Sequence, residues 1–386
     1  MATVVATWRS APRPPGSVML VGPDGCVVGG VCGGCVEGAV YESATRVTAD
    51  EPVLQRYGVS DPDAFAVGLT CGGTVDIFIE RVDRATFPQL GAVAEAIRTG
   101  TPVAVVTCLA TDAAIGPGVG TDAAIGPGVG TDAAIAPGVG ADAAVGGLPG
   151  RRLVVWADRV DGTLGTAALD AAATDEARDM LAAGRSGTRR YGGEGDRHSE
   201  GLTLFVAGYA PPPRMIIFGA TDVGAAVARL GAFLGYHVTV CDARPVFATH
   251  RRLPDAAEVV VEWPHRYLTG EAAAGRLDGR TVVCALTHDP KFDGPLLTVA
   301  LRLPLAYVGA MGSRRAQSDR LARLRAAHVD EATLGRLFGP VGLDLGARTP
   351  EETAVSIVAE IIAARSGGSG ARLTDTDGRI HHEPVT

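Results

Sequence analysis

The chain has 386 residues, of which 46% are hydrophobic and 5% aromatic, and its formal net charge at pH 7 is −8. This length suffices for two domains with separate cores, and the composition is typical of an α/β protein and not of a disordered chain. The acidic balance argues against a nucleic-acid partner, and the lack of an apolar run of about eighteen residues argues against a membrane span.

The start of the sequence and its cysteines indicate a compartment. The first ten residues contain no basic stretch followed by an apolar one, so a secretory signal is not expected. Without such a signal, the seven cysteines are expected to be reduced thiols. The sequence therefore predicts a cytoplasmic protein.

The first half, residues 1–184, is expected to form an α/β domain that begins with strands and glycine loops. A strand at Thr3–Thr7 is followed by a hairpin of Val18–Val21 with Cys26–Val28, which turns at a Pro-Asp-Gly sequence. A glycine loop (29–34) then leads into a helix over Val36–Val47. Further along, the pattern predicts a second glycine loop at 68–73 and a strand at 75–80. A helix at 87–98 and another strand at 102–108 are expected after them.

Three near-identical decapeptides, TDAAIGPGVG twice and then TDAAIAPGVG, fill residues 111–140. Each copy contains one Ile, one Val and a Pro-Gly break, so it can bury little apolar surface. We interpret residues 110–150 as a low-complexity insert in a hairpin loop; the alternative is a small ordered stack of turns or a binding arm. The flanking segments, Val103–Cys108 and Leu153–Ala157, are expected to pair as the hairpin stem.

The second half predicts a Rossmann-like domain over residues 213–366, after a linker and bridging strand at 185–212. A short apolar strand (Arg214–Phe218), a glycine turn, a helix (222–234) and a strand that ends at Asp242 form one βαβ unit. Strands near 258–261, 281–286 and 305–308 alternate with helices near 293–302 and 314–327, and a capped helix over 350–365 precedes a flexible tail at 367–386. The fold class is therefore α/β, with a doubly wound and mostly parallel second sheet.

The glycine turn, Gly219-Ala-Thr-Asp-Val-Gly224, is the first candidate site. In dinucleotide-binding folds a glycine at the middle position admits the pyrophosphate, and an acid after the second strand binds the ribose. Here Thr221 occupies the middle position and Asp242 that of the acid. A nicotinamide dinucleotide, another phosphate-bearing ligand and a purely structural turn all remain open.

Two further loops follow predicted strands at the same sheet edge. Gly312, Ser313 and Arg314 combine a loop, a helix cap and a guanidinium, which suits an anion, although a solvated surface turn would have the same residues. His288 and Asp289 lie in the segment Thr287–Asp293, which could bind an anion or move protons. Alternatively, Asp293 simply caps the next helix.

The cysteines of the first half are the fourth candidate. Cys32-Gly-Gly-Cys35 has the C-x-x-C form, which is compatible with a redox pair or, together with Cys26 and Cys71, with a zinc or iron–sulfur site. Cys35 stands just before a predicted helix, whose N-terminus favours a thiolate. The cysteines within apolar strands, Cys108, Cys241 and Cys284, are expected to be packing residues.

Taken in order, these segments resemble the XdhC/CoxI family. In the first half the resemblance rests on Ser10–Leu20, on Cys32-Gly-Gly-Cys-Val-Glu37 and on Gly68-Leu-Thr-Cys-Gly-Gly73. In the second half it rests on four segments, Pro212–Gly219, Thr287–Asp293, Tyr307–Arg315 and Pro340–Glu351. The chain departs from the family pattern at Cys32, where the family has Ser, and at Thr221, where a glycine is common.

The resemblance implies a maturation and insertion chaperone, not a turnover enzyme. Such a protein binds the molybdenum cofactor, supports its sulfuration and delivers it to the large subunit of a molybdenum hydroxylase of the xanthine or carbon monoxide dehydrogenase type. It further implies a cysteine desulfurase as sulfur source and a homodimer. Cys35 and Cys71, with Cys32 as a third thiol, would lie nearest the metal, and the loops of the second domain would hold the phosphate of the pterin or of its nucleotide form.

Two other functions remain open from the sequence. One is an NAD(P)-dependent oxidoreductase that uses the glycine turn and Asp242. The other is a non-catalytic partner that stabilises an immature hydroxylase, for which the thiols of Cys35 and Cys71 would be unnecessary.

Overall fold

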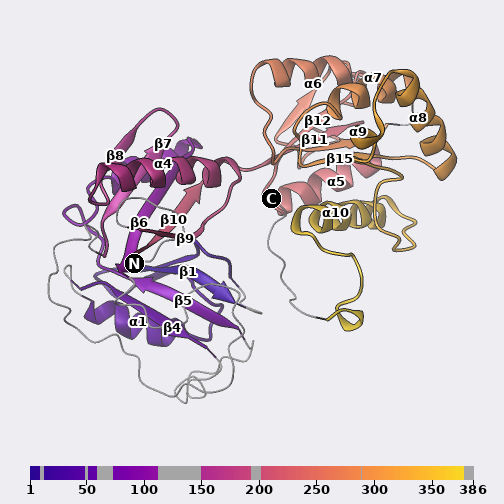
Figure 1. Ribbon diagram of the computed structural model, residues 1–386. Coiled ribbons are helices and arrows are strands. Elements are labelled where there is room, and N and C mark those ends of the chain that lie inside the picture. Colours follow the sequence, from indigo (N-terminus) through magenta and orange to yellow (C-terminus); the bar gives the residue numbers. More distant parts are fainter. Residues whose placement is uncertain are drawn as a thin grey trace. The chain divides into compact units, whose positions relative to one another are not determined.

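The computed structural model describes residues 1–8, 13–47, 51–58, 73–111, 149–192, 201–287 and 289–377. The chain divides into two compact units, one up to Pro211 and one from Pro212 onward (Figure 1). Residues 112–148, which hold all of the decapeptides except Thr111, lie outside the described residues, as do Cys71 and His288. Within the described ranges, no helix combines the length and the apolar character needed to cross a membrane.

The first unit contains a five-stranded antiparallel sheet in the order β3-β2-β1-β5-β4. Its strands are β1 (Ala2–Trp8), β2 (Val18–Val21), β3 (Val27–Gly29), β4 (Val53–Tyr57) and β5 (Thr74–Ile79). Val21 pairs with Val27, so the expected hairpin is confirmed. Strand β1 lies in the centre and pairs with β5 from Ala2 to Trp8, with a register shift between Val4 and Ala6.

A second antiparallel sheet of the same unit has the order β8-β7-β6-β10-β9. Its strands are β6 (Val103–Thr111), β7 (Arg152–Trp156), β8 (Val160–Gly162), β9 (Gly187–Tyr191) and β10 (Leu202–Tyr209). Strands β6 and β7 pair as expected, and the main chains of Cys108 and Gly150 close the stem with an N–H···O bond of 2.8 Å.

The interpretation of residues 185–200 as a linker is wrong for Gly187–Tyr191, which form strand β9. This segment is polar and rich in glycine, a composition typical of linkers. Its main chain nevertheless pairs with β10 along the edge of the sheet, and an edge strand with one exposed face tolerates such polar residues. Strand β10 therefore belongs to the body of the first unit.

The two sheets of the first unit pack face to face and carry helices on their outer faces. Val5 and Phe78 of the first sheet meet Val105 and Phe205 of the second in a shared core, to which α3 (Leu90–Thr99) contributes Val93. Helix α1 (Glu37–Arg46) covers the outer face of the first sheet, and α4 (Ala167–Ala182) that of the second (Figure 1).

The second unit is built on a six-stranded parallel sheet in the order β13-β12-β11-β14-β15-β16. Its strands are β11 (Arg214–Phe218), β12 (His237–Cys241), β13 (Glu258–Val260), β14 (Val282–Ala285), β15 (Tyr307–Ala310) and β16 (Leu337–Phe338). This is the doubly wound Rossmann order: β12 and β13 are added on one side of β11, and β14, β15 and β16 on the other. The predicted fold of this half is therefore confirmed.

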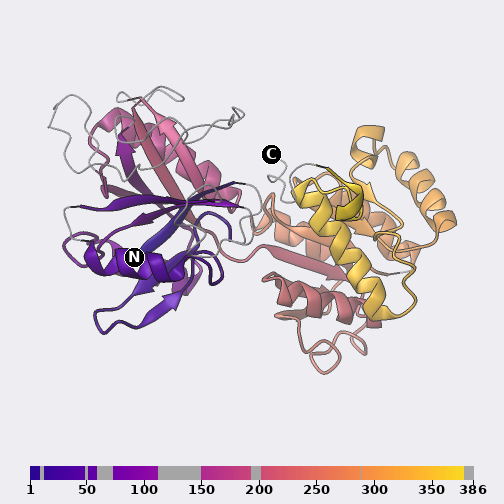
Figure 2. The same cartoon turned by 90° about the horizontal axis from the view of Figure 1, so that it is seen from below.

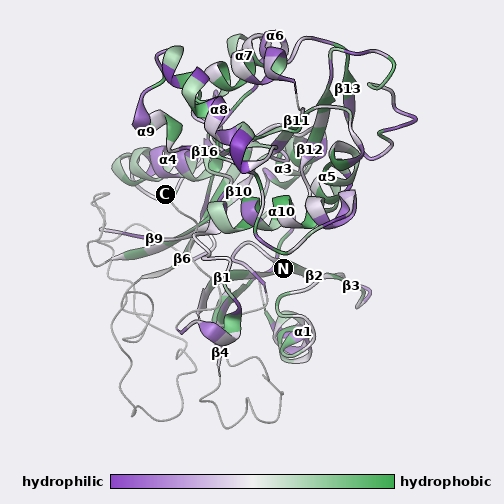
Figure 3. Cartoon of the chain, turned by 90° about the vertical axis from the view of Figure 1, so that its right-hand side faces the viewer, coloured by the Kyte–Doolittle hydropathy of each residue, from purple (hydrophilic) through white to green (hydrophobic). Residues whose placement is uncertain are grey.

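Helices cover both faces of this sheet because its central strands are apolar on both sides. Met215 and Ile217 face α5 (Asp222–Phe233) and α10 (Pro350–Ser366), which pack against each other (Figure 2, α10 in yellow). Ile216 and Phe218 face the opposite layer of α6 (Pro264–Ala273), α7 (Pro290–Ala300) and α8 (Arg314–Ala326). Colouring by hydropathy shows hydrophobic β11 in the interior and a largely hydrophilic α8 outside (Figure 3).

At the end of the second unit the capped helix expected over 350–365 is confirmed, whereas α9 (Glu331–Leu334) and β16 were not predicted. The short helix α9 connects α8 to β16, and the capping box of Thr349 with Glu352 starts α10. The described part of the tail contains a single 3-10 turn, η2 (Leu373–Asp375).

Candidate functional sites

The C-x-x-C motif lies in the loop 31–36, which ends at the N-terminus of α1. Cys32 is 1% exposed and packs in the core beneath the first sheet, whereas Cys35 is half-buried at the surface. Among the cysteines in the described ranges, only Cys26 and Cys35 reach the surface, and the other four are buried. Cys35 is therefore the accessible thiol of the motif.

Glu37 folds back over this loop and accepts hydrogen bonds from five of its main-chain amides. Its Oε1 atom accepts from Val31, Cys32 and Gly33 at 3.3, 2.9 and 2.8 Å, and its Oε2 atom accepts from Gly34 and Val36 at 2.8 and 3.2 Å. Burial by itself would raise the pKa of the carboxyl group, but the bonds from the loop amides lower it to about 2. The carboxylate is therefore fixed in its charged form.

Two glycines allow the loop to wrap around this carboxylate. Gly33 and Gly34 have φ angles of 102° and 118°, which residues with a Cβ rarely adopt, so both amides can turn inward. Sequence reasoning placed an acid behind Cys35 but assigned it no role, and the structure identifies Glu37 as the centre of the loop.

A multi-cysteine metal site does not form from the described residues of this unit. Nowhere in the described ranges do three His, Cys, Asp or Glu side chains come together as metal ligands. Cys26, Cys32 and Cys35 therefore do not form a ligand set on their own. The second glycine loop with Cys71 is outside those ranges, and its proposed role as a thiol near a metal stays a prediction.

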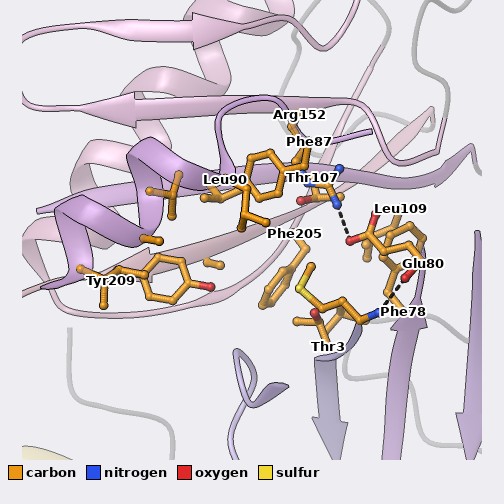
Figure 4. Close-up of a pocket in the computed structure, with 17 residues that line it drawn as sticks. Thr3, Phe78, Glu80, Phe87, Leu90, Thr107, Leu109, Arg152, Phe205 and Tyr209 are labelled. Atoms are coloured by element: carbon orange, nitrogen blue, oxygen red, sulfur yellow. Dashed lines mark hydrogen bonds and ion pairs between the residues drawn. The ribbon is translucent and has the colours of Figure 1, made fainter. Parts of the chain in front are cut away.

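An apolar pocket of about 130 Å³ opens between the two sheets of the first unit (Figure 4). Aromatic rings dominate its lining, namely those of Phe78, Phe87, Phe205 and Tyr209. At one end lies the buried ion pair of Glu80 with Arg152, whose side chains are 6% and 5% exposed. The Arg152 guanidinium also lies 4.5 Å from the centre of the Phe87 ring. The pocket could hold a small apolar group, and sequence reasoning did not find it because its lining comes from six separate helices and strands.

The glycine turn of the second unit is closely packed. A Cβ atom on Gly224 would lie 2.3 Å from the carbonyl oxygen of Gly219, and one on Gly219 would lie 3.0 Å from the carbonyl carbon of Leu286. Gly219 also has a φ angle of 120°. Both glycines are thus required for the approach of α5 to β11 and β14, whether or not a ligand binds.

Thr221 and Asp242 both bond within the protein at this turn. The Thr221 hydroxyl accepts from the Gly224 amide at 3.0 Å and caps α5. The Asp242 carboxylate, 1% exposed, accepts from the Ala220 amide at 2.9 Å and from the guanidinium of Arg244 at 2.7 Å. Burial alone would raise the pKa of Asp242, but these bonds hold it below its ordinary value.

The first turn of α5 also carries an acid, Asp222, which pairs with Arg252 at 3.2 Å. A phosphate at this helix end would face that negative charge. Together with the engaged carboxylate of Asp242, this geometry favours a structural turn over a dinucleotide bound in the usual pose.

The loops after β14 and β15 are joined by a buried ion pair that the sequence did not reveal. Arg320 on α8 contacts Asp293 on α7 at 3.2 Å, and both side chains are at most 5% exposed. Arg320 also donates to the carbonyl of Met311 at 2.6 Å, and the Thr287 hydroxyl donates to Asp293. The pair thereby connects Thr287 and Met311, at which the two candidate loops begin.

The remaining predicted residues are helix caps and first-turn residues at the same sheet edge. Asp289 caps α7 and pairs with Lys291 at 2.9 Å, so the alternative in which Asp293 caps this helix is wrong. Ser313 caps α8, and Arg314 follows it, exposed, in the first turn. Gly312 adopts a φ angle of 151° next to Arg320, and His288 is not among the described residues.

Comparison with known proteins adds family matches to this geometry. The sequence model of the XdhC Rossmann domain matches residues 215–361, and that of the XdhC and CoxI family matches residues 1–58 and 128–192. The matched ranges thus include the C-x-x-C loop in one unit and, in the other, the parallel sheet except its first residue, Arg214.

Curated relatives show the same likeness. A protein of Bacillus subtilis (strain 168), named as a probable xanthine dehydrogenase component, is 33% identical over 42% of this chain and 46% of its own length. The molybdenum cofactor insertion chaperone PaoD of Escherichia coli (strain K12) is 22% identical over 95% of this chain and 83% of its own length. The chain spans less than half the length of two of the curated relatives that it matches.

A solved structure described as a xanthine dehydrogenase from Bacillus halodurans has a TM-score of 0.64 to this chain, with 23% identity. The likeness covers 97% of this chain and 93% of that one. At this level of identity it shows a shared fold.

Proposed function

Because the chain belongs to the XdhC and CoxI family, we propose that it is a maturation factor that carries the molybdenum cofactor to a molybdenum hydroxylase. The observation that carries this proposal is the likeness to an insertion chaperone along 95% of the chain, together with family matches in both units. In this role the protein supports sulfuration of its cargo and releases it to the hydroxylase, and it does not act as a turnover enzyme.

We assign contact with the metal end of the cargo to the thiols of the first unit. Cys35 is half-buried and stands at the N-terminus of α1, where a soft sulfur ligand suits molybdenum or can carry a persulfide sulfur. Cys71 is the second proposed thiol. Cys32 is the weaker third, because its side chain points into the core.

We assign the phosphate of the pterin, or of its nucleotide form, to the loops after β14 and β15. Ser313 and Arg314 support this best, since an exposed guanidinium in the first turn of a capped helix suits an anion. Gly312 and Asp289 complete this edge, and His288 is a further proposed contact of the phosphate. Gly219, Thr221, Gly224 and Asp242 would act by shaping the adjoining turn, because their contacts lie within the protein.

The proposal includes three protein partners. The hydroxylase large subunit receives the cofactor, a cysteine desulfurase supplies the sulfur, and a second copy of the chain forms a homodimer. We propose that these encounters take place in the cytoplasm.

Metal and pterin analysis tests the proposal directly. The full chain is purified without oxygen from a host fed with molybdate, and molybdenum and oxidised pterin are measured per chain. We expect both in the wild type, their loss in Cys35→Ala and Cys71→Ala, and their retention in Cys26→Ala, which removes the other exposed thiol among the described residues. Full retention in Cys35→Ala would refute the assigned role of that thiol.

The same preparation separates the two other functions. Tight binding of NAD(P) without pterin would indicate an oxidoreductase, against which the engaged carboxylate of Asp242 argues. A stable complex with a hydroxylase, with no bound cofactor and no effect of the cysteine substitutions, would indicate a stabilising partner only.

A further inference from the structure

The carboxylate of Glu37 is enclosed by the loop that carries Cys32 and Cys35. Five amides between Val31 and Val36 point at its two oxygens. Such a concave set of main-chain N–H groups binds anions, and here the anion is supplied by the protein itself. The Glu37 carboxylate is thus the template around which the loop folds.

This template acts on the two cysteines in opposite ways. The Cys32 amide is held at 2.9 Å from Oε1 while its side chain is buried in the core. Cys35 lies between the amides of Gly34 and Val36, which both bond to Oε2, and its side chain remains partly exposed. Loss of the carboxylate would leave five loop amides without this acceptor, and Gly33 and Gly34 have no side chains that could hold the loop in its place.

We propose that Glu37 is the positioning residue of the C-x-x-C loop, whose carboxylate keeps Cys32 buried and presents Cys35 at the surface. The part of this inference that concerns the cargo rests on the proposed function. The part that concerns the two thiols does not.

Three variants of the full chain test the template. Glu37→Gln keeps the shape but offers a single carbonyl oxygen and turns an NH2 group toward amides that need an acceptor. Glu37→Ala removes the carboxylate and leaves the concave set of five amides, here called the nest, without its anion. Glu42→Gln is the matched control, since Glu42 lies on the same helix, is exposed, and pairs only with Arg46 among the described residues.

Alkylation by iodoacetamide, resolved by mass spectrometry for each cysteine, is the first measurement. In wild type and Glu42→Gln, Cys32 should stay protected while Cys35 and Cys26 react. In Glu37→Gln the loss of charge-assisted bonds should raise the Cys32 rate about tenfold or more, with Cys26 unchanged as internal reference. An unchanged Cys32 rate in a folded Glu37→Gln protein would overturn the proposal.

Chemical rescue distinguishes positioning from a general effect on folding. Added acetate can occupy the empty nest of Glu37→Ala and should restore Cys32 protection in a dose-dependent way, whereas chloride at the same ionic strength should not. If acetate has no effect on a folded Glu37→Ala protein, the template model fails.

Molybdenum retention is the last measurement. We expect Glu37→Gln to retain less than wild type, and Glu42→Gln to match wild type. If the wild type binds no molybdenum, the proposed function fails but the alkylation results still decide the role of Glu37. If the wild type binds molybdenum and Glu37→Gln retains all of it with Cys32 protected, only the positioning role is refuted.

Discussion

Replacement of Arg320 by Ala should destabilise the second unit more than any surface change on the same helix. The Arg320 and Asp293 side chains are 4% and 5% exposed and 3.2 Å apart, so removing the cation leaves a buried carboxylate without it. Breaking a buried pair in this way costs about 3–5 kcal/mol, a large part of a typical stability of about 5–15 kcal/mol. The bond from Arg320 to the Met311 carbonyl is lost as well.

The assay is urea unfolding of the full chain, with hydrogen exchange of α7 and α8 used to assign the loss to this unit. Arg323→Ala, on the exposed face of α8, should change the stability by less than about 0.5 kcal/mol. The double variant Asp293→Asn with Arg320→Ala should lose about 2 kcal/mol less than the sum of the single variants, because the two side chains are coupled. A loss below about 1 kcal/mol in Arg320→Ala would refute the reasoning.

Three further results are expected. Gly224→Ala should lower the unfolding free energy by about 2 kcal/mol, because the added Cβ would overlap the Gly219 carbonyl. Gly270→Ala, at an open position on α6, should raise the unfolding free energy by about 0.5–1 kcal/mol. Urea unfolding measures both. Asp242→Asn should lower the melting temperature through a loss of about 1–3 kcal/mol, because Arg244 loses its charged acceptor. The pKa of Glu37 is about 2 in the folded protein against an ordinary 4.5. The contribution of its carboxylate to loop order is therefore complete above about pH 4.5 and declines as the pH falls toward 2. The NMR chemical shifts of the Gly33 and Gly34 amides, recorded as a function of pH, measure this decline.

The Rossmann half could be predicted because its signals are local. Each central strand is a short apolar run, the turns contain glycine, and caps such as Thr349 mark helix starts. In the first unit the signals were weaker. Helix α4 was missed because its buried positions include the small residues Ala173 and Ala177, which give little contrast to its polar face. Strand β9 was missed because an edge strand can be polar.

The candidate sites show the same division between local and distant signals. The C-x-x-C spacing identified the loop before α1 as a candidate, but the hydrogen bonds of Glu37 to that loop depend on how the chain closes in three dimensions and not on residue type. Arg320 and Asp293 are far apart in sequence and belong to two different helices, so no local pattern connects them. Asp242 was found by its position after β12, yet its contacts are with Ala220 and Arg244.

The closed stem between β6 and β7 has a consequence for how this gene can change. Tandem copies of one coding unit are prone to slippage during DNA replication, and each event here adds or removes ten codons in frame. Because Cys108 and Gly150 already join the stem, the strands keep their register whatever the copy number. Closing a connection of twice the length costs only about 0.6 kcal/mol more, so related strains are expected to differ in the number of decapeptides while the sheet sequence stays the same.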